Sequence, residues 1–154
     1  MDIYLLRHAE AEAQGLGKPD GERELTEKGH QQAQRAAEWM KAQGIDLGGV
    51  ISSPLIRAVQ TARPVAEALG KAVVPDKRLA GLRLNAATVS EIARQYEVGE
   101  SLLLVGHEPD LSDLIAELTR GQVEVKKAAL ALVSCERVAS AGGVLRWLVP
   151  SKMQ

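Results

Sequence analysis

The chain has 154 residues, a length typical of one domain, and 45% of them are hydrophobic and 25% charged. A formal net charge of -1, with only 3% aromatic residues and no Phe, predicts neither a nucleic-acid-binding surface nor attraction to an anionic membrane. The single Cys135 excludes an internal disulfide, and no apolar stretch approaches the roughly 20 residues that span a bilayer, so we expect a cytoplasmic protein.

The first third of the chain predicts a strand, a loop and a helix. Asp2–Leu6 is a short run rich in strand-forming residues. The polar stretch Glu10–Glu24 contains several Gly residues and a Pro, which indicates an exposed loop. Leu25–Gln43 has small apolar residues at helical spacing, with Thr26 as the expected N-cap and Gly44 as the expected end.

A second strand and helix follow directly. Val50–Ser53 is a strand-like run, and Pro54 suits the first position of a helix that extends to Leu69. Pro64 lies inside this pattern, where the ring removes a backbone donor and crowds the preceding turn. We therefore expect a kink or a break at Pro64.

The next segments continue the alternation. Ala72–Val74 predicts a third strand, and Thr88–Tyr96 predicts a modest helix. Ser101–Val105 is a continuous apolar run, typical of a strand that is buried on both faces. Pro109–Arg120 predicts the helix that follows this strand.

The end of the chain has a different character. Lys127–Cys135 and Val144–Val149 are both strand-like, and a turn through Ser140–Gly143 joins them, which indicates an antiparallel hairpin. The whole pattern predicts a single α/β domain over residues 1–154: a doubly wound, mainly parallel sheet flanked by helices, with the hairpin at its end.

Four residues with phosphate chemistry lie just beyond the predicted strands. Arg7 and His8 follow the first strand, Arg57 lies in the helical turn after the second, and His107 follows the fourth. The carboxyl ends of parallel strands share one edge of the sheet, where ligands bind in such folds. We therefore expect these side chains to meet in one pocket.

The residue types in this pocket suit phosphoryl transfer. Two guanidinium groups bind a tetrahedral phosphoryl group through paired hydrogen bonds. A neutral imidazole is a nucleophile for phosphorus when its other nitrogen is held as a donor. A second histidine stabilises oxygens that gain charge in the transition state.

Four ordered segments resemble the histidine phosphatase superfamily, also called the phosphoglycerate mutase-like fold. The first resembles the Arg-His-Gly signature of that family, and the compact length with Gly-His-Glu-Pro is most similar to its small SixA-like branch of phosphohistidine phosphatases. The segments are Leu5–Glu10, Leu25–Gly29, Ser52–Ala62 and Val105–Pro109.

The resemblance implies the role of each site residue. It makes His8 the nucleophile that becomes phosphorylated, and it makes Arg7, Arg57 and His107 catalytic residues that bind the phosphate together with His8. The family requires no cofactor and no metal. Two arginines in the same pocket would also repel a divalent cation, and the sequence lacks a paired-histidine metal motif.

The sequence departs from the family pattern in two places. Ala9 replaces the Gly of the signature, a small change that still lets the backbone approach phosphate. Many members that cleave phosphate esters carry a glutamate general acid in a segment where this chain has no carboxylate between Asp76 and Glu91. Glu10, Glu108 and Asp110 are alternative candidates for the proton donor.

The missing acid bears on the substrate. A proton donor speeds departure of an alkoxide by about 10²–10⁴-fold. A histidine leaving group, with a pKa of about 6.5, takes a proton from solvent or departs neutral. The sequence therefore favours hydrolysis of protein-borne phosphohistidine, and short connections outside Glu10–Glu24 favour an open site that a histidine-phosphorylated protein reaches.

Two other functions stay open at this point. One is a small-molecule phosphomonoesterase of the same superfamily, and the other is a non-catalytic binder of phosphate or phosphoprotein. In each case phosphate or a similar anion occupies the pocket, and a monomer is expected. Arg23, Arg63 and Arg83 either extend the positive field or are solvated charges, and His30 is expected on the surface.

Overall fold

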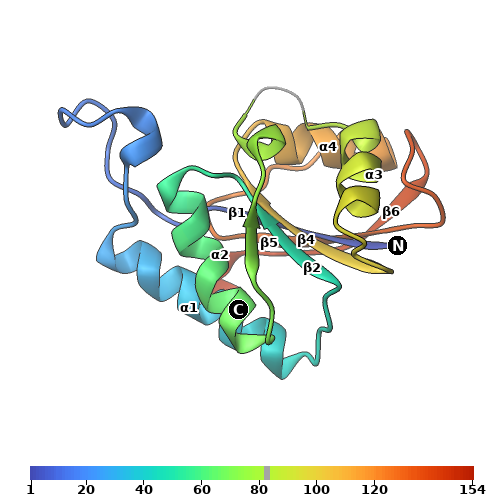
Figure 1. Ribbon diagram of the computed structural model, residues 1–154, viewed down its shortest axis with the longest axis horizontal. Coiled ribbons are helices and arrows are strands. Elements are labelled where there is room, and N and C mark those ends of the chain that lie inside the picture. Colours follow the sequence, from blue (N-terminus) through green and yellow to red (C-terminus); the bar gives the residue numbers. More distant parts are fainter. Residues whose placement is uncertain (82–83) are drawn as a thin grey trace.

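The computed structural model describes residues 1–81 and 84–154, and in these ranges the chain forms a six-stranded sheet flanked by helices (Figure 1). The strands lie in the order β3-β2-β4-β1-β5-β6. They are β1 (Asp2–Arg7), β2 (Gly49–Ser52), β3 (Val73–Pro75), β4 (Ser101–Gly106), β5 (Leu130–Cys135) and β6 (Gly143–Val149). The helices are α1 (Glu27–Ala42), α2 (Ile56–Ala68), α3 (Ala86–Gln95) and α4 (Asp110–Thr119), with short 3₁₀ turns η1 (Asp20–Glu22), η2 (Lys77–Leu79) and η3 (Ser151–Met153).

Strand direction confirms the predicted fold class. β1 pairs in parallel with β4, and β2 pairs in parallel with both β4 and β3. β5 runs antiparallel to β1, and β6 runs antiparallel to β5, so the hairpin extends the sheet at the β1 side. The sheet is therefore mixed α/β, with a parallel centre and the expected antiparallel end.

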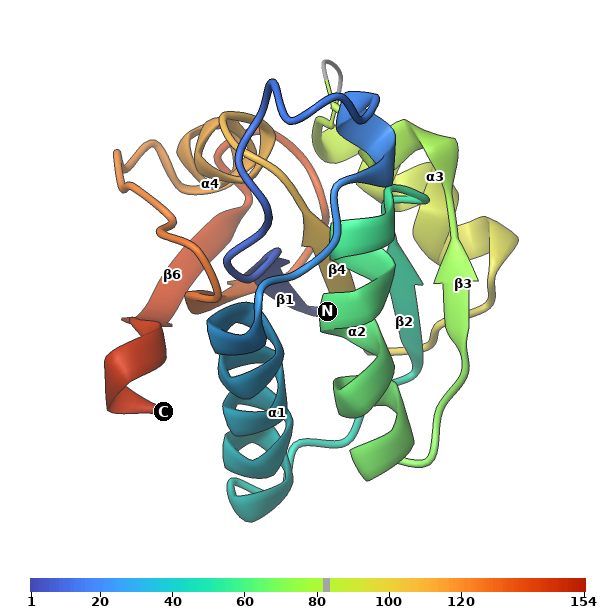
Figure 2. The same ribbon diagram turned by 90° about the vertical axis from the view of Figure 1, so that its left-hand side faces the viewer.

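Helices cover both faces of the sheet because alternate strand residues are apolar on both sides. Ile3 and Leu5 of β1 join the core under α3 and α4, whereas Tyr4 and Leu6 join the core under α1 and α2. Figure 2 looks onto the face that α1 and α2 cover. These two helices approach the sheet through small residues, which are Ala36 and Ala37 of α1 and Ala58, Ala62 and Ala66 of α2.

The helix limits agree with the sequence for α1 and differ for α2. The Thr26 hydroxyl caps α1 and accepts a hydrogen bond from the Gly29 N–H, as predicted. α2 begins at Ile56 rather than at Pro54, and it runs through Pro64 without a break. Of the kink or break that we expected at Pro64, the break is wrong: Pro64 lies half-exposed at the outer surface of α2, while alanines on the opposite side pack against the sheet.

The segment 10–24 forms a closed loop above the carboxyl ends of the parallel strands (Figures 1 and 2). An isolated bridge between Ala11 and Leu25 joins its two ends, and the Glu12 N–H donates to the Glu24 carbonyl at 2.8 Å. η1 lies within the loop and places Asp20 beside α2. Of the helices in the described residues, none is long and apolar enough to cross a membrane.

Candidate active site

The register of β1 and β4 brings the two predicted site histidines together. Arg7 pairs with Gly106, so His8 and His107 are the first residues beyond two adjacent parallel strands. The His8 N–H donates to the Gly106 carbonyl at 3.0 Å, and the two imidazole rings lie 5.2 Å apart between centroids. The predicted convergence of these two residues is therefore confirmed by strand pairing alone.

β2 contributes the third side of the site. The Ser53 N–H donates to the Val105 carbonyl at 2.9 Å, which continues the β2–β4 pairing by one residue. Arg57 then lies in the first turn of α2. His8, Arg57 and His107 expose only 6%, 5% and 7% of their surface, so all three side chains are buried.

The surroundings of His8 determine which of its nitrogens is reactive. Nδ1 lies 2.8 Å from the Ala9 carbonyl oxygen, and a carbonyl only accepts, so Nδ1 carries the proton. Burial, together with the nearby charges of Arg57 and Arg7, lowers the pKa of His8 to about 3. At neutral pH the ring is therefore uncharged, and Nε2 has a free lone pair.

His107 is held from one side only. Its Nε2 lies 2.7 Å from the Ser53 hydroxyl, whereas its Nδ1 is buried and has no hydrogen-bond partner. Burial lowers the pKa of His107 to about 4, and the charge of Arg57 acts in the same direction. His107 is therefore also neutral at neutral pH.

A chain of hydrogen bonds fixes Arg7 from the far side. Arg7 Nη1 donates to the Val125 carbonyl at 3.1 Å, and the Val125 N–H donates to the Ser112 hydroxyl at 3.1 Å. The Ser112 hydroxyl in turn donates to the Glu108 carboxylate. Glu108 is thus occupied in supporting the loop that holds Arg7, while Arg7 Nε is buried without a partner.

Asp20 of η1 binds Arg57 across the site. Arg57 Nη1 donates to the Asp20 carbonyl at 2.8 Å, and Nη2 donates to the Asp20 carboxylate at 3.0 Å. Arg23 binds the other carboxylate oxygen at 2.9 Å. Hydrogen bonds from Gln14, Arg57 and Arg23 lower the pKa of Asp20 to about 2, so it is an anion that bridges the loop to the site.

Three of the predicted site residues each have a buried side-chain nitrogen without a hydrogen-bond partner. Five buried side-chain polar atoms in the described part of the chain lack a partner, and these three are among them. Burying a polar group without a partner costs about 1–3 kcal/mol, so three such atoms on the residues of one site indicate a place for a polar ligand. These three atoms are Arg7 Nε, Arg57 Nε and His107 Nδ1.

Two carboxylates near this edge of the sheet are committed to other partners. Glu10 accepts a hydrogen bond from Thr26 at 3.0 Å and pairs with Lys28 at 3.2 Å, and these contacts lower the pKa of its carboxyl. Hydrogen bonds, chiefly from Arg78, lower the pKa of Asp76 to about 2. Both are ionised acceptors at neutral pH.

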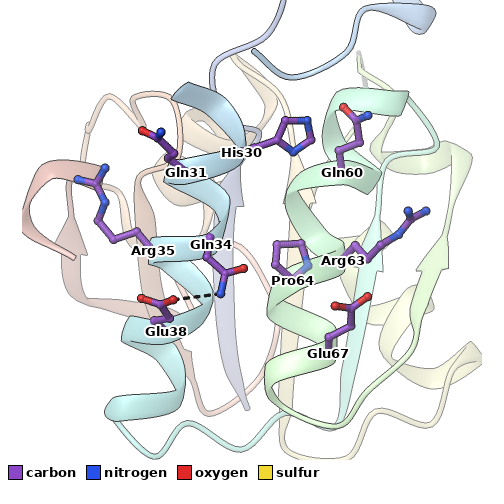
Figure 3. Close-up of a pocket in the computed structure, with 9 residues that line it drawn as sticks. All are labelled: His30, Gln31, Gln34, Arg35, Glu38, Gln60, Arg63, Pro64 and Glu67. Carbon is purple, nitrogen blue, oxygen red and sulfur yellow. Dashed lines mark hydrogen bonds between the residues drawn. The ribbon is translucent and has the colours of Figure 1, made fainter. Parts of the chain in front are cut away.

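A hollow on the surface lies away from these residues. It is a groove between α1 and α2, in which His30 of α1 lies opposite Gln60 of α2, and Arg63 and Glu67 lie further along (Figure 3). His30 is exposed there, as the sequence predicted. Arg63 is a solvated charge on this groove, and Arg83 lies outside the described residues. Among the residues that the structure describes, no three metal-ligating side chains form a cluster.

Sequence reasoning missed two contacts of the site. The sequence predicts Asp20 in an exposed loop, and it predicts Arg23, three residues later, as either part of the positive field of the pocket or a solvated charge. It predicts Ser53 at the end of a strand and within a family segment, without a role of its own. The close spacing of an acid and an arginine in Glu10–Glu24, and a serine directly before Pro54, were the available signals.

Comparison with known proteins agrees with this geometry. The model of the histidine phosphatase superfamily (branch 1) matches residues 3–98. The phosphohistidine phosphatase SixA of Escherichia coli strain K12 is 28% identical over 157 residues, covering 96% of this chain and 92% of that protein.

Solved structures share the fold over nearly the full length. The protein histidine phosphatase SixA complexed with tungstate superimposes with a TM-score of 0.81 at 24% identity, covering 99% of this chain and 98% of that one. A phosphoserine phosphatase of Entamoeba histolytica in complex with phosphoserine gives 0.76 at 19% identity, with coverage of 99% and 98%. Because the family model covers more than half of the chain, the chain belongs to the histidine phosphatase superfamily and is a phosphatase.

Proposed function

We propose that this phosphatase hydrolyses protein-borne phosphohistidine through a phosphorylated His8. The observation that carries the proposal is a neutral His8 whose Nδ1 is held as a donor, together with three buried site nitrogens that have no hydrogen-bond partner. A phosphoryl group supplies three acceptor oxygens, which suit the two guanidinium N–H groups and, when its Nδ1 carries the proton, His107.

The reaction proceeds in two balanced steps. His8 Nε2 attacks phosphorus and forms a P–N bond, while the bond to the substrate nitrogen breaks and its electron pair returns to the substrate imidazole. That imidazole takes a proton from solvent. Water then attacks phospho-His8, the P–N electron pair returns to Nε2, and phosphate is released with a proton to solvent.

The carboxylates of the site support phosphohistidine over an ester as the substrate. An ester needs a proton donor at its leaving oxygen, but Glu10 is an anion bound to Lys28, and Glu108 accepts from Ser112. Asp20 is an anion bound to Arg57. Imidazole needs no such donor, because its pKa is about 6.5. The similarity to SixA points the same way.

The test compares two substrates in the presence of EDTA. A histidine-phosphorylated carrier protein and p-nitrophenyl phosphate are incubated separately with wild type, His8→Ala and His30→Ala. His30 is the matched control because it is an exposed histidine of α1, distant from the donors. A radiolabelled carrier is also used to trap an acid-labile, base-stable phosphoenzyme.

We expect faster turnover of the carrier than of the ester, a phosphoenzyme in wild type and His30→Ala, and neither signal in His8→Ala. Preference for the ester would overturn the substrate assignment. If the protein binds phosphate but forms no phosphoenzyme and turns over neither substrate, it is a non-catalytic binder and the proposal is refuted.

A phosphomonoesterase is the second candidate, and one observation favours it. The related fold of a phosphoserine phosphatase holds phosphoserine, a phosphate ester. In this chain Asp110 is buried in the first turn of α4, three residues after His107. Loss of ester hydrolysis in a folded Asp110→Asn variant would support this candidate. Phosphohistidine hydrolysis would either be retained in the variant or be absent already in the wild type.

A further inference from the structure

The two nitrogens of His107 are in different surroundings, and this difference determines the position of its proton. Nε2 lies 2.7 Å from Ser53 Oγ, and Nδ1 is buried with no partner. A neutral imidazole has one N–H and one lone pair, so either Nε2 donates to Ser53 or Nε2 accepts from it. Only the second arrangement leaves a donor on Nδ1 for a bound phosphoryl group.

The environment of Ser53 distinguishes these arrangements. Ser53 is fully buried, and its Oγ accepts a hydrogen bond from the Leu55 N–H at 3.2 Å. In the described residues, the other hydrogen-bond neighbour of this oxygen is His107 Nε2. If Nε2 were protonated, the serine hydroxyl would have two donors facing it and a buried proton of its own with no acceptor.

An unmade hydrogen bond of that kind costs about 1–3 kcal/mol. When the hydroxyl instead donates to Nε2, Ser53 is fully satisfied: it accepts from Leu55 and donates to His107. We propose that Ser53 is a positioning residue that holds His107 in the Nδ1–H tautomer, so that a neutral imidazole donates a hydrogen bond to the transferring phosphoryl group.

This inference rests on the proposed function for its catalytic consequence, but the tautomer itself is a property of the free protein. It also explains the chain path before α2. The Leu55 N–H is turned back onto Ser53 Oγ, Leu55 is extended with ψ of 138°, and the helix begins only at Ile56. The Ser53 hydroxyl therefore takes part both in the turn that precedes α2 and in the hydrogen bond that orients the His107 proton.

The experiment records long-range ¹H–¹⁵N spectra of the histidine rings at pH 7 without phosphate. The chain has only three histidines, so His→Gln variants assign every signal. We expect His107 to show a protonated, pyrrole-type Nδ1 and an unprotonated, pyridine-type Nε2. A solvated neutral imidazole prefers the opposite tautomer, so this result would report the influence of Ser53.

Two serine variants complete the test. Ser53→Ala removes the hydroxyl, and we expect loss of the Nδ1–H tautomer with a drop in kcat of about 10²–10³-fold, the range for one transition-state donor, and a smaller change in KM. Ser52→Ala is the matched control, because Ser52 is equally buried but donates to the Ser53 carbonyl instead. It should keep the wild-type tautomer.

The possible outcomes separate this inference from the function on which it rests. A wild-type His107 that is protonated on Nε2, or a tautomer that is unchanged in Ser53→Ala, would overturn the role of Ser53. If Ser53→Ala does not fold, the wild-type spectrum alone still decides the tautomer. The expected tautomer in a protein that hydrolyses no phosphorylated substrate would support the tautomer assignment and refute the function.

Discussion

Acidification is expected to destabilise the fold through the two site histidines. In an unfolded chain a histidine has a pKa of about 6.5, whereas burial lowers the pKa of His8 to about 3 and that of His107 to about 4. The folded state therefore favours the neutral rings. Stability from this source is fully present above pH 6.5 and is lost as the pH falls toward the folded pKa values.

The size of the effect follows from the pKa values. Between pH 6.5 and pH 5.0 the unfolded chain takes up a proton at each ring and the folded chain does not. At about 1.4 kcal/mol per pH unit, each histidine lowers the free energy of unfolding by about 2 kcal/mol, or about 4 kcal/mol together. Asp20 and Asp76 have pKa values of about 2 in the fold, so their contribution is lost mainly below this window.

Urea unfolding at pH 7.5 and pH 5.0, in buffers without phosphate or sulfate, measures this loss. We expect about 4 kcal/mol for wild type and about half of that for His8→Gln and for His107→Gln, by the same proton linkage. His30→Gln is the control and should keep the wild-type difference, because His30 is exposed. A pH dependence that is the same in wild type and His8→Gln would refute the buried, neutral state of His8.

Three further predictions concern binding, proton transfer and packing. Arg57→Lys loses the planar guanidinium, so calorimetry should show phosphate affinity roughly tenfold to a hundredfold weaker, while Arg63→Lys on the outer groove should leave it unchanged. Glu10→Gln should change p-nitrophenyl phosphate hydrolysis by less than about threefold; a loss of about 10²-fold would identify Glu10 as the general acid. Gly48→Ala should lower the free energy of unfolding by about 3 kcal/mol or prevent folding, because its Cβ would lie 1.5 Å from the Val98 carbonyl oxygen; an unchanged urea midpoint would contradict this.

Local patterns were enough to predict the sheet and the placement of the main site residues. Continuous apolar runs predicted β1 and β4, and the residue after each strand predicted the meeting of His8 and His107. The prediction of a kink or a break at Pro64 was wrong as to the break, because the local rule did not include the packing of the other face of α2.

Contacts between distant segments were beyond the sequence. The Asp20–Arg57 ion pair joins residues 37 positions apart, and the Ser53–His107 hydrogen bond joins residues 54 apart. Each contact depends on the conformation of a loop or a turn, which neither the periodicity nor the composition of the sequence predicts. The specific role of a polar side chain therefore emerged only when its neighbours were known.

The strand register makes the site sensitive to one kind of length change and not to another. The distance between the histidine rings is set by the pairing of Arg7 with Gly106 and not by any loop. Successive strand residues face opposite sides, so one residue inserted into β1 would reverse the sides of Arg7 and His8 and abolish the site with every side chain retained. Changes of length in the loop 10–24 leave the register intact. The spacing of the two histidines is therefore protected from changes in this loop, whereas the contact of Asp20 with Arg57 depends on the loop.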